Sequence, residues 1–156
     1  MEEKQTTIRP SFEEIYMHLA ETLAARSTCS RCQVGTVITT TDFRKVLAVG
    51  YNGNYTGGPN GCDHPDVAGG CGCIHSEANA FLNCDTPRSV DKYIFVTMLP
   101  CLTCAKYAIN LGGVKMVFYR QVYRLTHSIS LLESAGIQVV HLPQHSKESC
   151  CTQYLK

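Results

Sequence analysis

The sequence predicts an α/β fold in which helices cover both faces of a central, five-stranded mixed sheet. Its elements indicate this: an opening amphipathic helix, a pair of short β-branched segments, and then helix-then-strand units that alternate to the end of the chain. The chain has 156 residues, of which 44% are hydrophobic, so one ordinary buried core is enough. We therefore expect a single three-layer α/β/α domain over residues 1–156.

The opening segment predicts a helix followed by a hairpin. Ser11 followed by Glu14 is a capping-box pattern, and apolar residues then recur at helical spacing to about Ala25. The segments 34–40 and 46–51 are rich in β-branched and apolar residues and flank a short polar turn. We expect them to pair as antiparallel strands.

A long loop and three helix-then-strand units make up the rest of the chain. Residues 52–72 are dense in Gly, Asn, Pro and Asp without periodicity, which predicts a long loop of the kind that often carries function. The units that follow are a helix near 75–84 with a strand over 93–99, a helix over 101–111 with a strand over 114–119, and a helix over 126–135 with a strand over 137–142. The polar tail, residues 143–156, is expected to be partly mobile.

Charge and composition exclude several classes of partner. The formal net charge is +1 and the aromatic content is 8% without tryptophan, so neither a basic field nor an aromatic groove for nucleic acid is expected. Residues 1–10 lack the apolar core of a signal peptide, and no stretch approaches the roughly 18 apolar residues of a membrane span. We expect a cytoplasmic protein, in which ten cysteines indicate metal ligation or buried thiols rather than disulfides.

Two short motifs carry the chemistry. His75-Ser76-Glu77 begins one predicted helix and Pro100-Cys101-Leu102-Thr103-Cys104 begins the next, which places both motifs at helix N-termini on one edge of the sheet. Cys101 and Cys104 are three residues apart on a first helical turn, so their thiols point the same way. A catalytic zinc takes three such ligands and leaves its fourth position to water. His75, Cys101 and Cys104 are therefore the predicted zinc ligands.

Glu77 is the predicted catalytic residue. Two residues beyond His75 on a helix, it cannot easily bind the same metal, but it can reach a water in the open position as general acid and base. Together, His-x-Glu and Pro-Cys-x-x-Cys are the signature of zinc-dependent base deaminases. Two non-catalytic alternatives are a pair of buried cysteines beside a capping histidine, and a closed structural zinc site. A structural zinc site would require a fourth ligand here and would leave Glu77 without a role.

Over nearly its whole length the sequence resembles the deoxycytidylate (dCMP) deaminase branch of the zinc-dependent cytidine and deoxycytidylate deaminase family. The landmarks, in order, are Arg26-Ser27-Thr28-Cys29, Val34-Gly35, Gly50-Tyr51-Asn52-Gly53, His75-Ser76-Glu77-Ala78-Asn79-Ala80, Pro100-Cys101-Leu102-Thr103-Cys104-Ala105-Lys106, and Tyr119-Arg120 followed by Tyr123. Ser76 departs from the family motif, which usually has alanine there. The resemblance implies the cytidine deaminase-like fold and hydrolysis of dCMP to dUMP, with water attacking C4 while Glu77 protonates N3 and then the departing amine.

Substrate contacts are expected from six residues: Asn52, Asn79, Arg26, Tyr119, Arg120 and Tyr123. By resemblance, the two asparagines contact the sugar and base, although Asn-Gly favours turns by itself. Arg120, flanked by tyrosines after an apolar strand, is a candidate for the nucleotide phosphate, with a solvated surface arginine as the alternative. Arg26 is a second phosphate candidate, although a cation there also complements the helix dipole.

A second, structural zinc is expected because some family members carry one at comparable places. The preferred ligands are Cys29, Cys62, Cys71 and Cys73, with His64 as a possible replacement for Cys71. Such a site would hold the long glycine-rich loop against the hairpin.

The resemblance also implies dCTP and dTTP as effectors acting near residues 54–61, and a homo-oligomer, with a hexamer favoured. Other deaminases of the same fold, acting on cytidine, guanine or tRNA adenosine, are the nearest alternatives for the function. A non-catalytic zinc module that binds a protein partner is the alternative from a different class, and the intact Glu77 argues against it.

Overall fold

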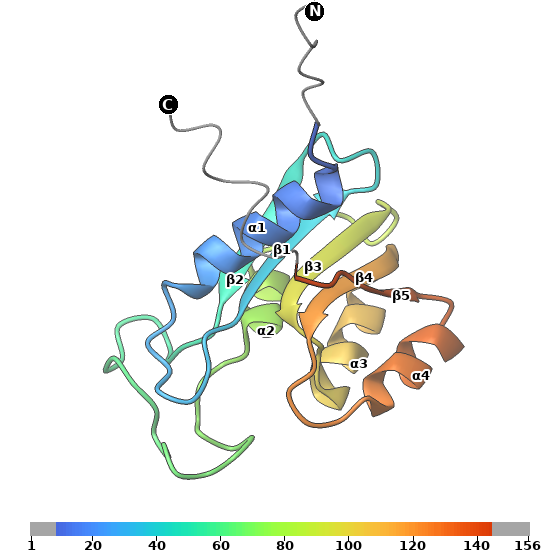
Figure 1. Ribbon diagram of the computed structural model, residues 1–156. Helices are drawn as coiled ribbons and strands as arrows, with labels where there is room; N and C mark the ends of the chain where they lie inside the picture. The colour runs from blue at the N-terminus through green and yellow to red at the C-terminus, as the bar shows by residue number, and fades with distance from the viewer. Residues whose placement is uncertain (1–8, 145–156) are drawn as a thin grey trace, which may run out of the picture.

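The structure, a computed structural model, describes residues 9–144 and is built around one five-stranded sheet (Figure 1). Its helices are α1 (Phe12–Ala24), α2 (Ser76–Leu82), α3 (Leu102–Leu111) and α4 (His127–Ser134). Its strands are β1 (Gly35–Thr40), β2 (Val46–Tyr51), β3 (Lys92–Met98), β4 (Val114–Gln121) and β5 (Gln138–His141). Every predicted element is present, and most of the tail that was expected to be mobile lies outside the described residues.

The sheet is mixed, as predicted, with strand order β2-β1-β3-β4-β5. β1 pairs antiparallel with β2 and β3, whereas β3, β4 and β5 run parallel. Helix α1 covers one face, and α2, α3 and α4 cover the other (Figure 1). This is the predicted three-layer arrangement, and it brings the N-termini of α2 and α3 close together.

Two apolar clusters fill the space between the layers. One lies between α1 and the sheet and includes Met17, Phe95 and Phe118, with the rings of the two phenylalanines stacked at 4.7 Å between centroids. The other lies under α2–α4 and includes Ile38 and Leu132. Met17 and Phe95 are fully buried, and each side chain of this kind stabilises the fold by about 1.5–3 kcal/mol.

Glycines let two helices approach the hairpin closely. A Cβ at Gly50 of β2 would lie 2.5 Å from the amide nitrogen of Ala80 and overlap the carbonyl oxygen of Ser76, both in α2. A Cβ at Gly35 of β1 would lie 2.8 Å from the amide nitrogen of Ala24 in α1. The contacts of β1 with α1 and of β2 with α2 therefore each require a glycine.

Polar side chains bind backbone carbonyls at two further places. At the β2 edge of the sheet, the side-chain amides of Asn79 in α2 and of Asn83, its C-cap residue, donate to the carbonyls of Tyr51 and Val49, at 2.8 and 3.2 Å. Elsewhere, the Nζ atom of the fully buried Lys92 donates to the carbonyls of Pro87, Val90 and Gly112, at 2.9, 2.7 and 3.2 Å. Burial lowers the pKa of the Lys92 ammonium.

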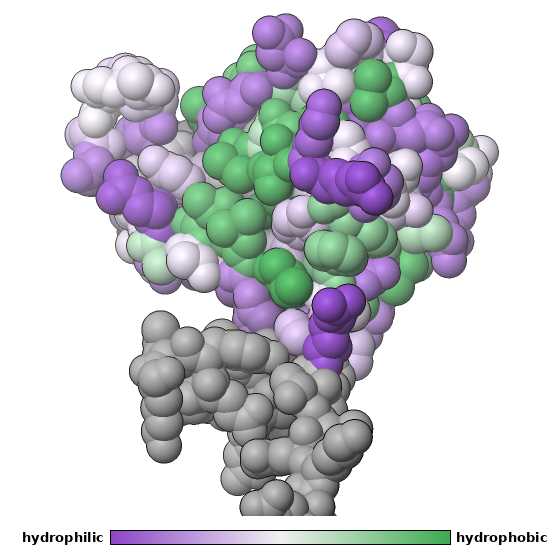
Figure 2. All heavy atoms as spheres, turned by 90° about the horizontal axis from the view of Figure 1, so that it is seen from above, coloured by the Kyte–Doolittle hydropathy of each residue, from purple (hydrophilic) through white to green (hydrophobic). Residues whose placement is uncertain are grey.

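The outer surface mixes apolar and polar side chains. Seen from above, apolar side chains gather near the middle of the face, with hydrophilic ones around them (Figure 2). Among the described residues, no helix is long and apolar enough to cross a membrane.

Candidate active site

The two sequence motifs meet at the starts of α2 and α3. His75 is the N-cap of α2 and Cys101 is the N-cap of α3, where its Sγ accepts the Cys104 amide at 3.5 Å. The His75 Nδ1 atom lies 3.6 Å from the Cys101 Sγ and 3.5 Å from the Cys104 Sγ. The predicted ligands therefore converge, because each motif begins a helix and the two helix N-termini lie close together.

This cluster fits a zinc ion. Bonds of about 2.0–2.3 Å in a tetrahedral site place neighbouring ligand atoms roughly 3.5 Å apart, and the observed separations match. The ligand atoms of His75, Cys101 and Cys104 all lie within 4.8 Å of one another. Three ligands of this kind leave one coordination position open, which is the arrangement of catalytic rather than structural zinc.

The thiols of the cluster already favour a thiolate. Hydrogen bonding, chiefly with Cys104, lowers the pKa of Cys101 to about 3. The same interaction, together with burial, raises the pKa of Cys104. The hydrogen bond with Cys101 raises the pKa of His75. A thiolate is the form that binds zinc.

Glu77 is buried beside the cluster, with 4% of its surface exposed. The Ser76 hydroxyl donates to its Oε2 at 3.0 Å, and Thr36 of β1 lies 2.8 Å from the Ser76 hydroxyl. Burial raises the pKa of the Glu77 carboxyl, against the smaller opposing effect of the Ser76 hydrogen bond. This environment orients the carboxyl group and brings its protonated form closer to neutral pH.

A cavity of about 620 Å³ opens beside these residues. Its lining includes His75, Cys101, Cys104 and the buried Glu77, and it extends to the more exposed Tyr123. Cavities of roughly 300–1,000 Å³ are the usual size for small-molecule sites. A mononucleotide therefore has room next to the candidate metal centre.

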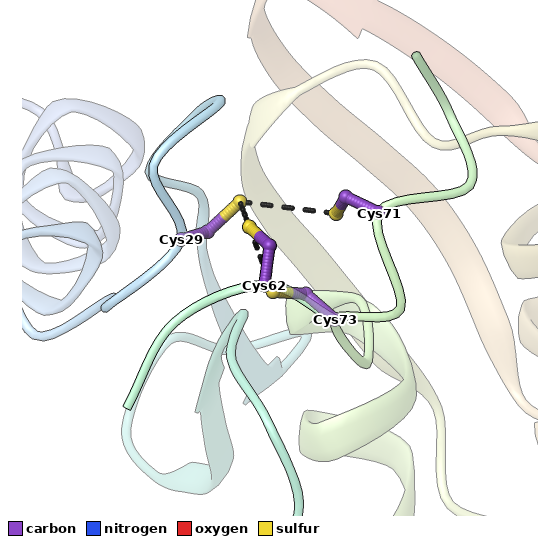
Figure 3. A group of neighbouring side chains, drawn as sticks. All are labelled: Cys29, Cys62, Cys71 and Cys73. Carbon is purple, nitrogen blue, oxygen red and sulfur yellow. Dashed lines mark hydrogen bonds between the residues drawn. The ribbon is translucent and has the colours of Figure 1, made fainter. Parts of the chain in front are cut away.

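Four further cysteines converge near the same cavity (Figure 3). The Cys29 Sγ lies 3.4 Å from that of Cys62 and 4.0 Å from that of Cys71, and the Cys62 and Cys73 sulfurs are 3.6 Å apart. All four are free thiols at the spacing of a tetrahedral four-thiolate site. His64 donates its backbone amide to the Cys71 carbonyl, and the side chains that converge are those of the four cysteines.

Residues 10–120 match the model of the cytidine and deoxycytidylate deaminase zinc-binding region. The chain belongs to the cytidine and deoxycytidylate deaminase family. The deoxycytidylate deaminase of Schizosaccharomyces pombe is 35% identical over 84% of this chain and 44% of that protein. ComE operon protein 2 of Bacillus subtilis is 36% identical over 84% of this chain and 71% of that protein.

A solved structure supports the same assignment. The dCMP deaminase from the cyanophage S-TIM5, in complex with dCMP and dUMP, matches with a TM-score of 0.75 and 32% identity, over 87% of this chain and 100% of that one. The fold is therefore the cytidine deaminase-like fold that the resemblance implied. The chain spans less than half the length of the yeast relative described above.

The structure places two of the six expected substrate residues in the cavity of this deaminase-family chain, Asn52 and Tyr123. The Asn52 amide also bridges the backbone, accepting from the Val34 amide and donating to the Cys32 carbonyl, both at 2.8 Å. It therefore fixes the start of β1, a role beyond the turn chemistry weighed from the sequence.

Three expected residues lie elsewhere. Asn79 donates to the β2 edge, Arg26 lies over the Tyr51 ring at 5.8 Å, and the Tyr119 ring stacks on His141 at 5.0 Å. None of the three is among the described residues that line the cavity. The structure therefore places these three side chains away from the residues that line the cavity.

Arg120 is not among the described residues that line the cavity either. It is 5% exposed and lies on the α1 side of the sheet, where it donates to the carboxylates of Glu21 at 2.8 Å and Glu14 at 3.0 Å. It also donates to the carbonyls of Leu142 and Pro143. The guanidinium thus joins α1, β4 and the segment after β5, away from the residues that line the cavity.

Two arginines in the cavity were missed from the sequence, Arg31 and Arg124. Arg31 lies just before β1 and Arg124 in the β4–α4 loop, and neither segment has a periodicity that fixes where side chains point. The available signal was position, since Arg31 is two residues from Cys29 and Arg124 is next to Tyr123.

Proposed function

We propose that this chain hydrolyses dCMP to dUMP and ammonia, using a zinc ion held by His75, Cys101 and Cys104. The observation that carries the proposal is the buried Glu77 carboxyl beside an open three-ligand cluster, in a cavity with room for a nucleotide. The similarity to a phage dCMP deaminase that binds dCMP and dUMP supports the choice of substrate.

The reaction needs a proton carrier at the cavity. A bound zinc would supply Lewis-acid activation of a water molecule. Glu77 takes a proton from that water and gives it to N3 of the cytosine ring as the water oxygen bonds to C4. Glu77 then takes the second proton from that oxygen and passes it to the amine, so the C4–N4 bond breaks and ammonia leaves a carbonyl at C4.

Neighbouring side chains hold Glu77 ready for both transfers. The Ser76 hydroxyl donates to one carboxylate oxygen and is itself hydrogen-bonded to Thr36. Because the Ser76 side chain is completely buried, water does not compete for this contact. Ser76 thereby takes an orienting role in this chain, although family members usually carry alanine at its position.

Asn52 and Tyr123 are the proposed substrate contacts among the residues that the sequence singled out. The Asn52 amide uses one N–H and its oxygen on the backbone, so one N–H donor remains for the sugar or the base. Its bonds to Cys32 and Val34 hold that donor in a fixed orientation. The Tyr123 hydroxyl supplies a second polar group in the same cavity.

A second zinc ion, held by Cys29, Cys62, Cys71 and Cys73, is proposed as a structural centre. The four thiols come from the segment after α1 and from both ends of the 62–73 loop (Figure 3). The loop would then be tied down two residues before His75, so the structural metal would also fix the start of α2.

Assembly and regulation are proposed on the family resemblance. We expect a homo-oligomer, with a hexamer favoured. Residues 54–61 form an exposed loop segment in which dCTP and dTTP would act. A dCMP saturation curve that dCTP leaves unchanged would remove the regulatory proposal. The cytoplasmic location stays a prediction.

Ammonia release from dCMP, CMP, deoxycytidine and dCTP tests the main proposal. The zinc-loaded wild type should act on dCMP, and Glu77→Ala should lower kcat by about 10²–10⁴-fold while keeping its zinc. Glu133→Ala, which replaces an exposed glutamate in α4, is the matched control and should behave as the wild type. If the zinc-loaded protein releases no ammonia from any of the four compounds, a deaminase for another base or a non-catalytic zinc module would be favoured.

A further inference from the structure

Two buried hydroxyl groups lead from the sheet to the Glu77 carboxyl. The hydroxyl of Thr36, in β1, lies 2.8 Å from that of Ser76, the first residue of α2. The Ser76 hydroxyl lies 3.0 Å from the Glu77 Oε2 atom. Thr36 and Ser76 are fully buried, so water does not come between them, and each hydroxyl depends on protein neighbours for its hydrogen bonds. These two side chains are called the hydroxyl pair below.

The surroundings of Thr36 would suit an apolar side chain. In the sheet it pairs with Gly50 of β2 and Val96 of β3. Ile38, two residues along the same face of β1, belongs to the apolar cluster under α2–α4. A buried hydroxyl in such a place is unfavourable unless it has a partner, and within residues 9–144 the Ser76 hydroxyl is the partner that it has.

Gly50 brings the hydroxyl pair together. A Cβ at Gly50 would overlap the carbonyl oxygen of Ser76, and Gly50 is the residue of β2 that pairs with Thr36. Helix α2 therefore approaches the sheet most closely beside Thr36. The packing of the hairpin against α2 thus sets the contact between the two hydroxyls.

The direction of the hydrogen bonds follows from the number of protons. An ionised carboxylate only accepts, and a serine hydroxyl has one proton to give. When Glu77 acts as a base, the Ser76 proton is therefore used on Oε2, and Thr36 must donate its own proton to the Ser76 oxygen. Because Oε2 already receives a hydrogen bond, Oε1 is the oxygen left to take up a proton and release it.

We infer that Thr36 is a positioning residue for the reaction, which acts through Ser76 and assigns both proton transfers to the Oε1 atom of Glu77. The inference rests on the proposed function, because it names the atom with which the proposed proton carrier works. It adds a residue of β1, outside the two zinc motifs, to the catalytic machinery. Family members usually carry alanine in place of Ser76, so the hydroxyl pair is not a general feature of the family.

Kinetics on dCMP with substitutions at one atom test the role of Thr36. Thr36→Val keeps the branched shape and removes the hydroxyl, so it should lower kcat by about 5- to 20-fold and change KM less than about twofold. Thr36→Ser keeps the hydroxyl and removes a buried methyl group, so it should lower Tm but keep at least about half of the wild-type kcat. An unchanged kcat in Thr36→Val, or an equal loss in Thr36→Ser, would overturn the inference.

The matched control is a threonine of the same strand. Thr39 is also fully buried, and its hydroxyl has no hydrogen-bond partner among the described residues. Thr39→Val makes the same chemical change as Thr36→Val and should keep the wild-type kcat. A loss in Thr39→Val as large as that in Thr36→Val would show that any change inside β1 disturbs the site, which would also overturn the inference.

A second substitution shows whether Thr36 acts through Ser76. Once Ser76→Ala has removed the middle hydroxyl, adding Thr36→Val should change kcat by less than about twofold, because no path to Glu77 remains. If the two losses in kcat multiply instead, Thr36 acts independently of Ser76 and the inference is wrong.

Thermal melting separates this test from the proposed function, because it needs no turnover. Ser76→Ala and Thr36→Val each leave a buried hydroxyl short of a partner, so each should lower Tm, and the double variant should lower it by less than the sum. Additive losses in Tm would overturn the hydroxyl pair whether or not dCMP is deaminated. If the losses are not additive but the wild type releases no ammonia, the hydroxyl pair stands and the proposed reaction fails.

Discussion

Substituting Gly50 by alanine should disturb the active site from a position that touches no substrate. The new Cβ would lie 2.5 Å from the Ala80 nitrogen and overlap the Ser76 carbonyl oxygen. Non-bonded heavy atoms rest at about 3.5 Å or more, so α2 must move by roughly 1 Å. The first turn of α2 carries Glu77, and its N-cap is His75.

The size of the effect follows from that displacement. Overpacking of this kind costs about 1–3 kcal/mol, which corresponds to a fall in Tm of about 2–12 °C for a chain of this length. A misplacement of about 1 Å at a catalytic group can lower the rate by about 10²-fold. We therefore expect Gly50→Ala to fold, to melt earlier, and to lose about 10²-fold in kcat on dCMP.

Two other glycines complete the experiment. Gly35→Ala forces α1 away instead, so it should lower Tm by a similar amount with little loss of kcat, because α1 holds no zinc ligand. A Cβ at Gly53 would meet only the Thr28 hydroxyl, at 3.7 Å, so Gly53→Ala should match the wild type. Thermal melting, zinc content and ammonia release would be measured on all three. Wild-type kcat in Gly50→Ala, or an equal loss in Gly35→Ala, would refute the reasoning.

Three other substitutions test separate parts of the structure. Cys71→Ser should lower the zinc content from about two ions to about one per chain by elemental analysis; unchanged zinc would exclude the four-thiolate site. Lys92→Met leaves three carbonyls without their charged donor and should cost about 2–4 kcal/mol in urea unfolding; a neutral result would mean that water replaces the ammonium. Arg120→Met should cost a similar amount by breaking its pairs with Glu14 and Glu21, with KM for dCMP unchanged, and a raised KM would restore its expected phosphate role.

Regular elements and local motifs were predictable because short-range rules govern them. The capping box at Ser11 appears as a 3.2 Å bond from the Glu14 amide to the Ser11 hydroxyl. The helix-then-strand alternation gave every strand of the mixed sheet, although β4 runs to Gln121, two residues beyond the prediction. The predicted zinc ligands converge because each motif begins a helix, a position that sequence patterns mark well.

The arginines that line the cavity were not predictable in the same way. Tyr119 and Arg120 are adjacent in sequence, but successive side chains of a strand point to opposite faces of the sheet. Arg120 therefore meets α1 while Tyr119 packs on the other side, and their apparent cluster with Tyr123 does not exist. Arg31 and Arg124 come together only through loop conformation and tertiary packing, which no periodicity encodes.

The asparagines of α2 bear on how this chain avoids unwanted association. β2 is a terminal strand of the sheet, and strands in that position offer free backbone groups on which another polypeptide can extend the sheet. Asn79 and Asn83 occupy the carbonyls of Tyr51 and Val49 with their own amides. Two acceptors of this strand are thereby already in use, which makes extension of the sheet by another chain less favourable.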